Sequence, residues 1–442
     1  MFRRLSISSF RFFLAGKGLS FRTGKYFGQA LLVGLIAGFV VVAFRYLIDL
    51  GFAWIFDPAA ASGSRWLFVV LPPVGALAGY LLIRRFDSLE HARGTDSAIL
   101  AYHRRCGYVP PAVLPVKSVA SVLTIASGGS AGYEGPVTLL GAACGSLVAS
   151  WFSLPARARR ILMSAGISAG IAALFQAPLA GAIFGFEVLY SSSDIEYECI
   201  LPCFTAATVA YTVFACFFGW GTLFQMPDVA YENGLRLLPY FVLALVVTFG
   251  ARFYIRFFTS TARAFESLPV PGWLRVVLGG LVTGLLGLAV PAILGTSYPV
   301  IQTVLSGASR AIPALLVLFF AKVVATSFTV GSGGSGGVFA PALVCGGALG
   351  AAVGQAFAGL LPASFGIQPA AFALVGMAGF LASSIRTPMA AIVMVAEISG
   401  NHGLLVPAMW VCGISFWLNS GWSLNRSQPH SRETSPVHRT LL

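Results

Sequence analysis

Long apolar stretches alternate with short charged segments along almost the whole chain after residue 26. Residues 323–385 carry no charge at all, although one helix needs only about 20 apolar residues to cross a bilayer. Several helices must share that run, separated by its own glycines and prolines. Further apolar spans cover residues 27–44, 66–83 and 161–186. The pattern predicts an all-α polytopic membrane protein built from tilted and broken helices.

One carboxylate, Glu134, interrupts an otherwise uncharged run over residues 118–156. It lies in the sequence SGGSAGYEGPVTLLGAACG at residues 127–145, with glycines on both sides. An ionisable group inside a long apolar span is costly and usually faces a cavity or a partner. Glu134 is therefore a functional candidate, and the alternative is a carboxylate that only caps a helix.

Composition supports the membrane class and limits the partners. The 442 residues are 57% hydrophobic and 10% charged, with a mean hydropathy of +0.84, which is too apolar for a soluble surface. The net charge of +13 does not indicate nucleic acid, because the basic residues lie at the chain ends and in short loops. By the positive-inside rule, both termini are predicted to be cytoplasmic in a multi-pass protein of the plasma (inner) membrane. The scattered cysteines have no zinc spacing, so no metal site is expected.

Two blocks of sequence recur in the same order along the chain. Residues 127–136, SGGSAGYEGP, align with residues 332–341, SGGSGGVFAP, at an offset of 205. A proline and a glutamate nine residues apart recur at residues 178–187 and 388–397. This duplication predicts two membrane repeats. The predicted organisation is a cytoplasmic N-terminal segment (1–26), a first membrane repeat (27–230), a linker (231–238), a second membrane repeat (239–422) and a short cytoplasmic tail without a regulatory domain (423–442).

Both repeated loops bring glycine-rich backbone to the start of a helix. A helix N-terminus carries roughly half a positive charge and unpaired N–H donors, and glycine lets an ion approach the backbone closely. A cation site would need several carboxylates or a ring of carbonyls, and each run offers at most one carboxylate. Doubled membrane proteins commonly place their site at the interface of two inverted-topology repeats. We therefore predict an anion site between the two halves.

These motifs resemble those of the CLC family of chloride channels and proton-coupled chloride transporters. Residues 132–136, GYEGP, resemble the family's G-K/R-E-G-P motif, and residues 337–341, GVFAP, match G-x-F-x-P. The resemblance runs from about residue 25 to residue 422. It implies a homodimer in the lipid bilayer with one anion pathway per subunit, a bound chloride ion and no other cofactor.

The resemblance also assigns roles to single residues. It places Glu134 on the family's extracellular gating glutamate and the amides of Val338 and Phe339 on its central anion site. The candidates for anion binding are Gly132, Tyr133, Gly135, Val338, Phe339, Thr95, Ser97 and Asn425.

Three positions depart from the family pattern. Tyr133 replaces the basic residue that precedes the gating glutamate. The family's serine motif is poorly kept at residues 94–97, GTDS, so either Thr95 or Ser97 supplies the pore hydroxyl. Asn425 stands where the family has a pore tyrosine, which predicts a wider or more polar inner end.

Val188 bears on the transport mechanism. Proton-exchanging members often carry two consecutive glutamates at this place, the second being their proton acceptor, and here the pair is Glu187 and Val188. Valine cannot bind a proton, and channel members typically have valine there. We expect chloride or a similar small anion to pass a pore gated by Glu134, channel-like and with weak or no proton coupling. An H⁺/Cl⁻ antiporter stays open as the alternative, because some transporters of the family lack that glutamate.

An intramembrane hydrolase is a remote alternative, because Ser130 lies in a Gly-x-Ser-x-Gly pattern. The same pattern recurs at residues 166–170 and 333–337, which is typical of small-residue helix packing. All five histidines lie in polar connectors or in the tail, so no general base is evident within the membrane, and we expect no enzymatic activity.

Two polar segments are predicted to be solvated. Residues 86–108 carry charges of both signs and are expected to form an aqueous loop on the cytoplasmic side, with a helix start at residues 94–97. Asp194, Glu196 and Glu198 are expected to form a solvated turn. Glu187 and Glu397, at corresponding places of the two repeats, are expected to make packing or loop contacts.

Overall fold

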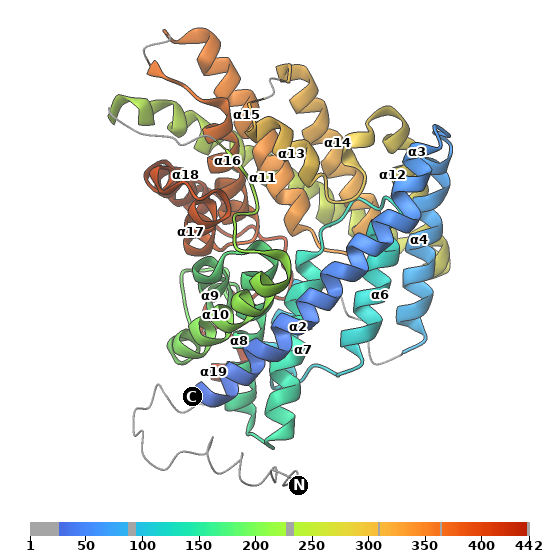
Figure 1. Ribbon diagram of the computed structural model, residues 1–442, viewed down its shortest axis with the longest axis vertical. Coiled ribbons are helices and arrows are strands. Elements are labelled where there is room, and N and C mark those ends of the chain that lie inside the picture. The colour runs from blue at the N-terminus through green and yellow to red at the C-terminus, as the bar shows by residue number, and fades with distance from the viewer. Residues whose placement is uncertain (1–25, 87–93, 227–233, 308–309, 363–364, 440–442) are drawn as a thin grey trace.

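The protein is described here by a computed structural model that covers residues 26–86, 94–226, 234–307, 310–362 and 365–439. Helices make up most of the described residues (Figure 1). The helices are α2 (Phe27–Gly51), α3 (Asp57–Ala61), α4 (Leu67–Arg84), α5 (Thr95–Arg104), α6 (Val113–Ala126), α7 (Glu134–Trp151), α8 (Ala156–Phe175), α9 (Pro178–Glu187), α10 (Ile200–Phe218), α11 (Leu238–Ser267), α12 (Gly272–Ala289), α13 (Tyr298–Leu305), α14 (Ile312–Gly331), α15 (Phe339–Leu360), α16 (Pro369–Ser384), α17 (Pro388–Ser399), α18 (Leu405–Leu418) and α19 (Pro436–Arg439), with a π-helical turn at Phe52–Phe56 and 3₁₀ turns at Tyr197–Cys199, Gly234–Leu237, Pro291–Ile293 and His402–Leu404.

Eight helical segments within the described residues are long and apolar enough to cross a membrane. The first of them, Phe27–Ala61, is 35 residues long and exceeds the predicted span of residues 27–44. The π-helical turn Phe52–Phe56 joins α2 to α3 without a break, so the helix continues past Arg45 and Asp49. The predicted span at residues 66–83 agrees with α4 to within one residue.

The two halves of the chain repeat the same packing, which confirms the predicted fold of two inverted-topology repeats (Figure 1). In the first half α7 packs along α8, and in the second half α15 packs along α16. A Cβ atom on Gly141 would lie 2.1 Å from the carbonyl oxygen of Gly166, and one on Gly346 would lie 2.5 Å from that of Gly376. Gly141 and Gly346 are 205 residues apart, the offset of the repeated loops, and Gly166 and Gly376 are 210 apart, the offset of the repeated proline and glutamate.

Two short helices start at the repeated prolines. Pro178 and Pro388 each occupy the first turn of their helix, where a missing N–H costs nothing. The residues before them leave the helical conformation, as expected of residues that precede proline. The short helices α9 and α17 pack against one another across the boundary between the halves (Figure 1).

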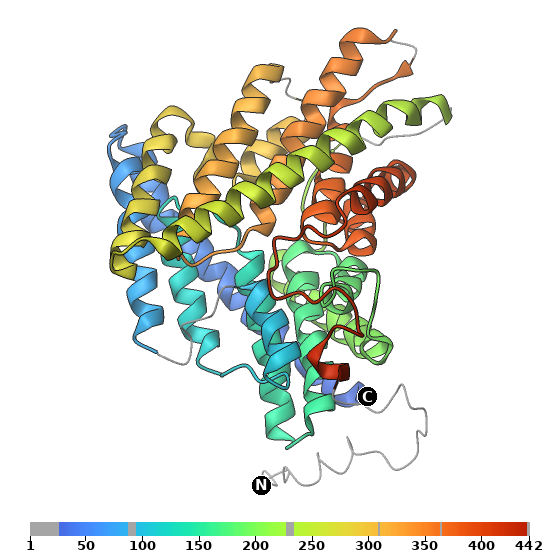
Figure 2. The same ribbon diagram turned by 180° about the vertical axis from the view of Figure 1, so that it is seen from behind.

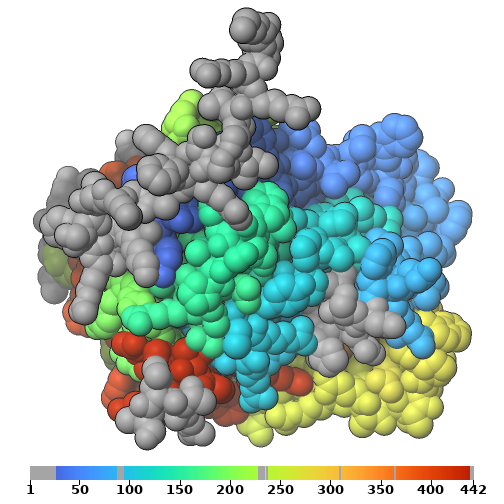
Figure 3. Space-filling model, turned by 90° about the horizontal axis from the view of Figure 1, so that it is seen from below, coloured from blue at the N-terminus to red at the C-terminus, as the bar shows by residue number. Residues whose placement is uncertain are grey.

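The segments predicted to be solvated are more ordered than the sequence indicates. Helix α5 occupies part of residues 86–108 and buries Ile99 and Tyr102, so this connector is not simply an aqueous loop; residues 87–93 lie outside the described part. Figure 2 shows the C-terminal residues running back along the body of the protein, and Figure 3 shows them beside the segment near residue 100. Ser427 binds the Asp96 carboxylate through its amide at 2.7 Å and its hydroxyl at 3.0 Å.

The prediction of a solvated acidic turn is wrong for Glu196. Its side chain is buried, accepts a hydrogen bond from the Tyr190 hydroxyl and pairs with His438 at 2.7 Å and Arg432 at 3.5 Å. The tail therefore covers this carboxylate. Of the predicted linker 231–238, the first three residues lie outside the described part, as does nearly all of the N-terminal segment 1–26, and the domain boundaries stay predictions.

Candidate functional site

The two repeated loops pair directly with each other. The Gly132 amide donates to the Gly337 carbonyl at 2.8 Å, and the Gly337 amide donates to the Gly132 carbonyl at 2.7 Å. Helix α7 begins two residues after Gly132, and α15 begins two residues after Gly337. The N-termini of two long helices from opposite repeats therefore meet at one place inside the protein.

Each loop is also held by the helix that precedes the other loop. The Ser130 hydroxyl lies 3.0 Å from the Thr326 hydroxyl on α14. The Ser335 hydroxyl accepts from the Lys117 ammonium group at 2.9 Å and lies 3.0 Å from the Ser121 hydroxyl on α6. Ser130 and Ser335 are 205 residues apart, so this exchange of contacts follows the repeat. The exchange fixes the two halves against each other around the paired glycines.

Glu134 reaches from the first repeat into the second. Its side chain is fully buried, and its Oε2 atom accepts a hydrogen bond from the Ala340 amide at 3.1 Å, in the first turn of α15. The Oε1 atom accepts from the Tyr298 hydroxyl at 2.5 Å. A carboxylate here lies at a helix N-terminus, the place where a small anion is stabilised by unpaired amides and the helix dipole.

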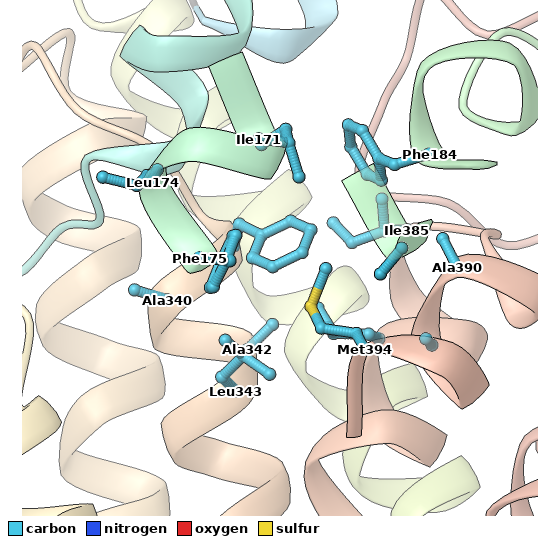
Figure 4. Packing of buried hydrophobic residues seen from close by; sticks show 14 of the residues in the cluster. Ile171, Leu174, Phe175, Phe184, Ala340, Ala342, Leu343, Ile385, Ala390 and Met394 are labelled. Atoms are coloured by element: carbon cyan, nitrogen blue, oxygen red, sulfur yellow. The ribbon is translucent and has the colours of Figure 1, made fainter. Parts of the chain in front are cut away.

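Val338 and Phe339 lie at the start of the same helix. They are the N-cap and the first residue of α15, so their amides have no acceptor within the helix. The Phe339 ring contacts Phe175 and Phe184, with ring centres 5.4 Å and 5.7 Å apart. Figure 4 shows Phe175 and Phe184 among apolar neighbours that include Ile385. The predicted amide site is therefore walled by apolar side chains.

A cavity lies on another side of the paired loops, and we call it the inner cavity. It is bounded by Thr95 and Asn425 and by Gly135, Gly337 and Val338. Asn425 is 5% exposed, and its Nδ2 atom has no hydrogen-bond partner among the described residues. The structure thus brings Thr95 and Asn425 together. The complete lining is Thr95, Asp96, Gly135, Phe258, Ala262, Val330, Gly331, Gly336, Gly337, Val338, Leu424, Asn425 and Arg426.

Helix α5 explains the placement of Thr95. The helix begins at Thr95 as predicted, but its N-cap is Gly94, with a φ of +73° and no capping side chain. Thr95, the first residue of the helix, is one of the residues that line the inner cavity. Ser97 is the third residue of the helix and is not among the described residues that bound the cavity.

A second hollow, the outer vestibule, lies beyond Glu134 and is lined by Tyr133, Tyr298 and Arg45, among others. The Arg45 guanidinium comes from α2, interacts with the Tyr133 side chain and binds the Asp49 carboxylate at 3.0 Å. A basic group is therefore present beside position 133, although it comes from another helix. The sequence analysis did not identify Arg45 as a site residue. The feature that could have indicated it is its position directly after the apolar span 27–44.

Lys322 is the second residue that sequence reasoning missed. It is fully buried in α14 and donates to the Ile293 carbonyl at 3.0 Å and to the Gly295 carbonyl and the Ser297 hydroxyl at 2.8 Å. The signal was present, because Lys117 and Lys322 are 205 residues apart, the same offset that relates the two loops.

Val188 is fully buried at the end of α9, and its carbonyl accepts from the Gln428 side chain at 2.9 Å. Its neighbour Glu187 is also buried and accepts from the Met389 and Ala390 amides at the start of α17, both at 2.8 Å. Both oxygens of the Glu187 carboxylate, next to Val188, are thus bound by amides at the start of α17.

The fold and this site define a class of protein, a polytopic membrane protein in which two inverted repeats bring the N-termini of one helix each to the same place. Residues 74–420 match the family described as Voltage gated chloride channel. The chain belongs to this family, the CLC family, whose members transport anions across membranes.

Named relatives and solved structures agree with this assignment. The chain is 30% identical to "Putative chloride channel protein ClcB-like" from Ralstonia nicotianae, over 86% of this chain and 90% of that protein. It is 31% identical to "H(+)/Cl(-) exchange transporter ClcA" from Klebsiella pneumoniae, over 87% of this chain and 83% of that protein.

Two solved structures share the fold. A slow cyanobacterial Cl⁻/H⁺ antiporter has a TM-score of 0.80 and 22% identity, over 91% of this chain and 95% of that one. A CLC-type fluoride/proton antiporter has a TM-score of 0.79 and 23% identity, over 91% and 97%.

Proposed function

We propose that the chain carries chloride or similar small anions through a pore gated by Glu134, with weak or no coupling to protons. The observation that carries this proposal is the Glu134 carboxylate on the Ala340 amide, at the N-terminus of α15. In this position the ionised side chain holds the place of an anion and closes the path. Protonation removes its charge and weakens that hold, so a lower pH opens the pore.

The anion site in this proposal is made mainly of backbone. The amides of Val338 and Phe339 bind the chloride ion, and Gly132, Tyr133 and Gly135 border it from the first repeat. Paired glycines let the two helix starts come close enough for one ion to feel both dipoles. A bound chloride ion is the only ligand that the proposal requires.

At the inner end we assign Thr95 and Asn425 to the pathway. The buried Asn425 amide nitrogen lines the inner cavity without a protein partner among the described residues, so an anion there gains a hydrogen-bond donor. Asparagine is smaller than tyrosine and more polar, which favours a hydrated anion at this point.

Weak proton coupling is supported by the surroundings of Val188. No titratable group is available at that position, and Glu187 already accepts two backbone amides. Figure 4 shows Phe184, Ile385 and Met394 as neighbouring members of one buried apolar cluster. Proton transfer needs polar groups or water in line, and these side chains supply none.

H⁺/Cl⁻ antiport is the second candidate function. The observation in its favour is the name of several relatives, since ClcA proteins about 30% identical to this chain are called exchange transporters. An exchanger of this kind would carry protons to Glu134 without a glutamate at position 188.

The remote hydrolase alternative gains no support from Ser130. Its hydroxyl lies against the Thr326 hydroxyl, and the Thr329 hydroxyl accepts from its amide at 3.2 Å. Neither partner is a general base. These contacts serve the pairing of the repeats.

The same proposal covers the assembly and its orientation. We infer a homodimer in the inner membrane with both termini cytoplasmic, in line with the family resemblance and the basic chain ends. Exposed apolar side chains such as Trp54, Phe249 and Leu238 suit contact with lipid or a second subunit.

The decisive experiment measures the reversal potential in reconstituted vesicles under opposed chloride and pH gradients. We expect a value at the chloride Nernst potential that does not respond to the pH gradient. A shift with the proton gradient would establish antiport instead. A Val188→Glu variant, checked for wild-type thermal stability, tests whether a carboxylate at this position introduces coupling.

Gating is tested separately with Glu134→Gln, which keeps the size of the side chain but cannot ionise. We expect faster chloride flux at pH 7.5 and a flux that no longer changes with pH. If the variant conducts no more than wild type and keeps its pH dependence, Glu134 is not the gate.

A further inference from the structure

Both oxygens of the Glu134 carboxylate are held by the second repeat. One oxygen accepts the Ala340 amide at 3.1 Å, which is the contact expected of a gating carboxylate at a helix N-terminus. The other accepts the phenolic hydroxyl of Tyr298 at 2.5 Å. Tyr298 is the first residue of α13 and is 8% exposed. Release of the carboxylate must therefore break a bond to a side chain as well as a bond to the backbone.

The Tyr298 ring is fixed by its neighbours. Tyr133 and Phe224 both contact it edge to face, with ring centres 5.7 Å and 5.6 Å away. Such contacts stabilise an aromatic ring beyond its burial alone. The three rings line the outer vestibule, so Tyr298 stands between that hollow and Glu134.

The backbone that presents Tyr298 is strained and has its own support. Ser297 has a φ of +65°, in the left-handed region that a non-glycine residue enters only at a cost. The buried ammonium group of Lys322 holds the Ser297 hydroxyl and the carbonyls of Ile293 and Gly295. One lysine thus fixes the turn from which the Tyr298 hydroxyl points at the carboxylate.

We propose that Tyr298 is a positioning residue that latches the ionised Glu134 in its closed position. The inference rests on the proposed gating by Glu134. A hydroxyl donor stabilises a charged carboxylate more strongly than a neutral one, so the latch favours the closed, ionised gate. The outer path opens when Glu134 takes up a proton and releases both donors.

Other charged and titratable groups act on this carboxylate or on the aromatic rings beside it. Lys322 lies on α14, Tyr133 precedes Glu134 at the start of α7, and Arg45 with its partner Asp49 comes from α2. Lys322 favours the ionised gate, whereas Arg45 acts on the Tyr133 and Tyr298 side chains and Asp49 acts on Tyr133. All of these groups stay in place when only the Tyr298 hydroxyl is removed. A change in the pH dependence of flux can then be assigned to that hydroxyl.

The test is the Tyr298→Phe variant in chloride flux assays from pH 4.5 to 8. Phenylalanine keeps the ring and its contacts and removes only the donor. We expect several-fold more flux at pH 7.5 and a pH of half-maximal flux that moves upward by about one unit, the size expected for one hydrogen bond to a charged group. A curve that overlays wild type, or one that moves to lower pH, would overturn the latch.

Two further variants keep the result interpretable. Tyr240→Phe removes the hydroxyl of another buried tyrosine, stacked on Phe372 at 4.1 Å, and should leave the pH curve unchanged. In a Glu134→Gln background, Tyr298→Phe should add nothing, because the ionised group it holds is gone. An added effect in that background would contradict the latch.

The two hypotheses fail in different ways. If Glu134→Gln keeps the wild-type pH dependence, the gate is refuted and the latch with it. If Glu134→Gln loses that dependence while Tyr298→Phe matches wild type, only the latch is refuted. Equal thermal stability of Tyr298→Phe and wild type in detergent excludes a folding defect as the cause of either result.

Discussion

Glu187 and Glu397 cap each other's helices across the repeat boundary. Glu187 ends α9 and accepts two amides at the start of α17. Glu397 lies in α17 and accepts the Leu179 and Ala180 amides at the start of α9, at 3.0 Å and 2.7 Å. Each carboxylate satisfies helix N–H groups that have no partner within their own helix. The two short helices are therefore joined by a reciprocal pair of caps, one from each half.

Because each glutamate caps the other's helix, replacing either one by alanine should lower the free energy of unfolding. Glu187→Ala leaves two buried amides without acceptors and should destabilise the folded protein by about 2–4 kcal/mol. Glu397 is only half-buried, so Glu397→Ala should cost about half as much. Denaturant or thermal unfolding in detergent measures both. If Glu187→Ala is as stable as wild type but transports poorly, the carboxylate acts in transport and not as a cap.

The pairing of the two loops predicts that Gly337 tolerates no side chain. A Cβ atom there would lie 2.6 Å from the Gly135 nitrogen, a backbone atom that cannot move aside cheaply. Gly337→Ala should push the α15 N-terminus away from α7, cost about 1–3 kcal/mol and abolish most chloride flux. Gly359→Ala on the same helix is the matched control, because nothing lies within 4 Å of its added atom. Comparable flux in the two variants would contradict this account of the site.

Arginines beside the inner cavity predict a salt-dependent flux. Arg256 and Arg263 line a groove with Arg426, and neither of the first two has an acidic partner in the described part of the chain. Arg426, which pairs with Glu266 at 3.6 Å, borders the inner cavity as well, so the groove places the charges of Arg256 and Arg263 beside that cavity. Such charge raises the local concentration of anions.

The double variant Arg256→Gln, Arg263→Gln should lower chloride flux several-fold at 20 mM ionic strength, and by little at about 300 mM, where charges are screened. The corresponding lysine variant keeps the charge and should behave like wild type. A loss that persists at high salt would point to damaged packing.

His103 predicts that the docked tail weakens in acid. Its Nε2 atom lies 2.9 Å from the Leu189 carbonyl, and its Nδ1 atom 2.8 Å from the Ser435 hydroxyl. Burial lowers the pKa of His103 from its ordinary 6.5 to about 4. Between those two values an exposed histidine gains a proton and the buried one does not, so stability is full above pH 6.5 and falls toward pH 4.

The expected loss from this residue is about 2 kcal/mol at pH 5. Unfolding of the detergent-solubilised protein at pH 7 and pH 5 measures it, with hydrogen exchange of residues 423–438 as a local probe of the tail. His103→Asn should be less stable at pH 7 but should show a flatter dependence on pH over this window. An unchanged slope in the variant would assign the acid effect to other groups.

Much of the architecture could be predicted from local pattern. The membrane class, the duplication and the anomalous carboxylate at position 134 are visible as spacing and charge. The prediction was wrong where a polar segment was expected to be solvated, as at Glu196. The Glu196 carboxylate is covered by His438 and Arg432 of the C-terminal tail, and the sequence does not show that the tail folds back onto it. The offset of 205 also relates Lys117 to Lys322. Both lysines lie outside the glycine-rich blocks, so a comparison of those blocks alone does not identify them.

By itself the sequence determined that this is a doubled membrane protein with one titratable group at the start of a broken helix. Hydrophobic spacing and repeated glycines and prolines are local properties, so they can be seen without coordinates. Only the tertiary structure decided what holds that group. Tyr298 and Lys322 act on Glu134, and Arg45 acts on its neighbour Tyr133. These three residues come from separate helices, so their meeting depends on how those helices pack, which no spacing along the chain records.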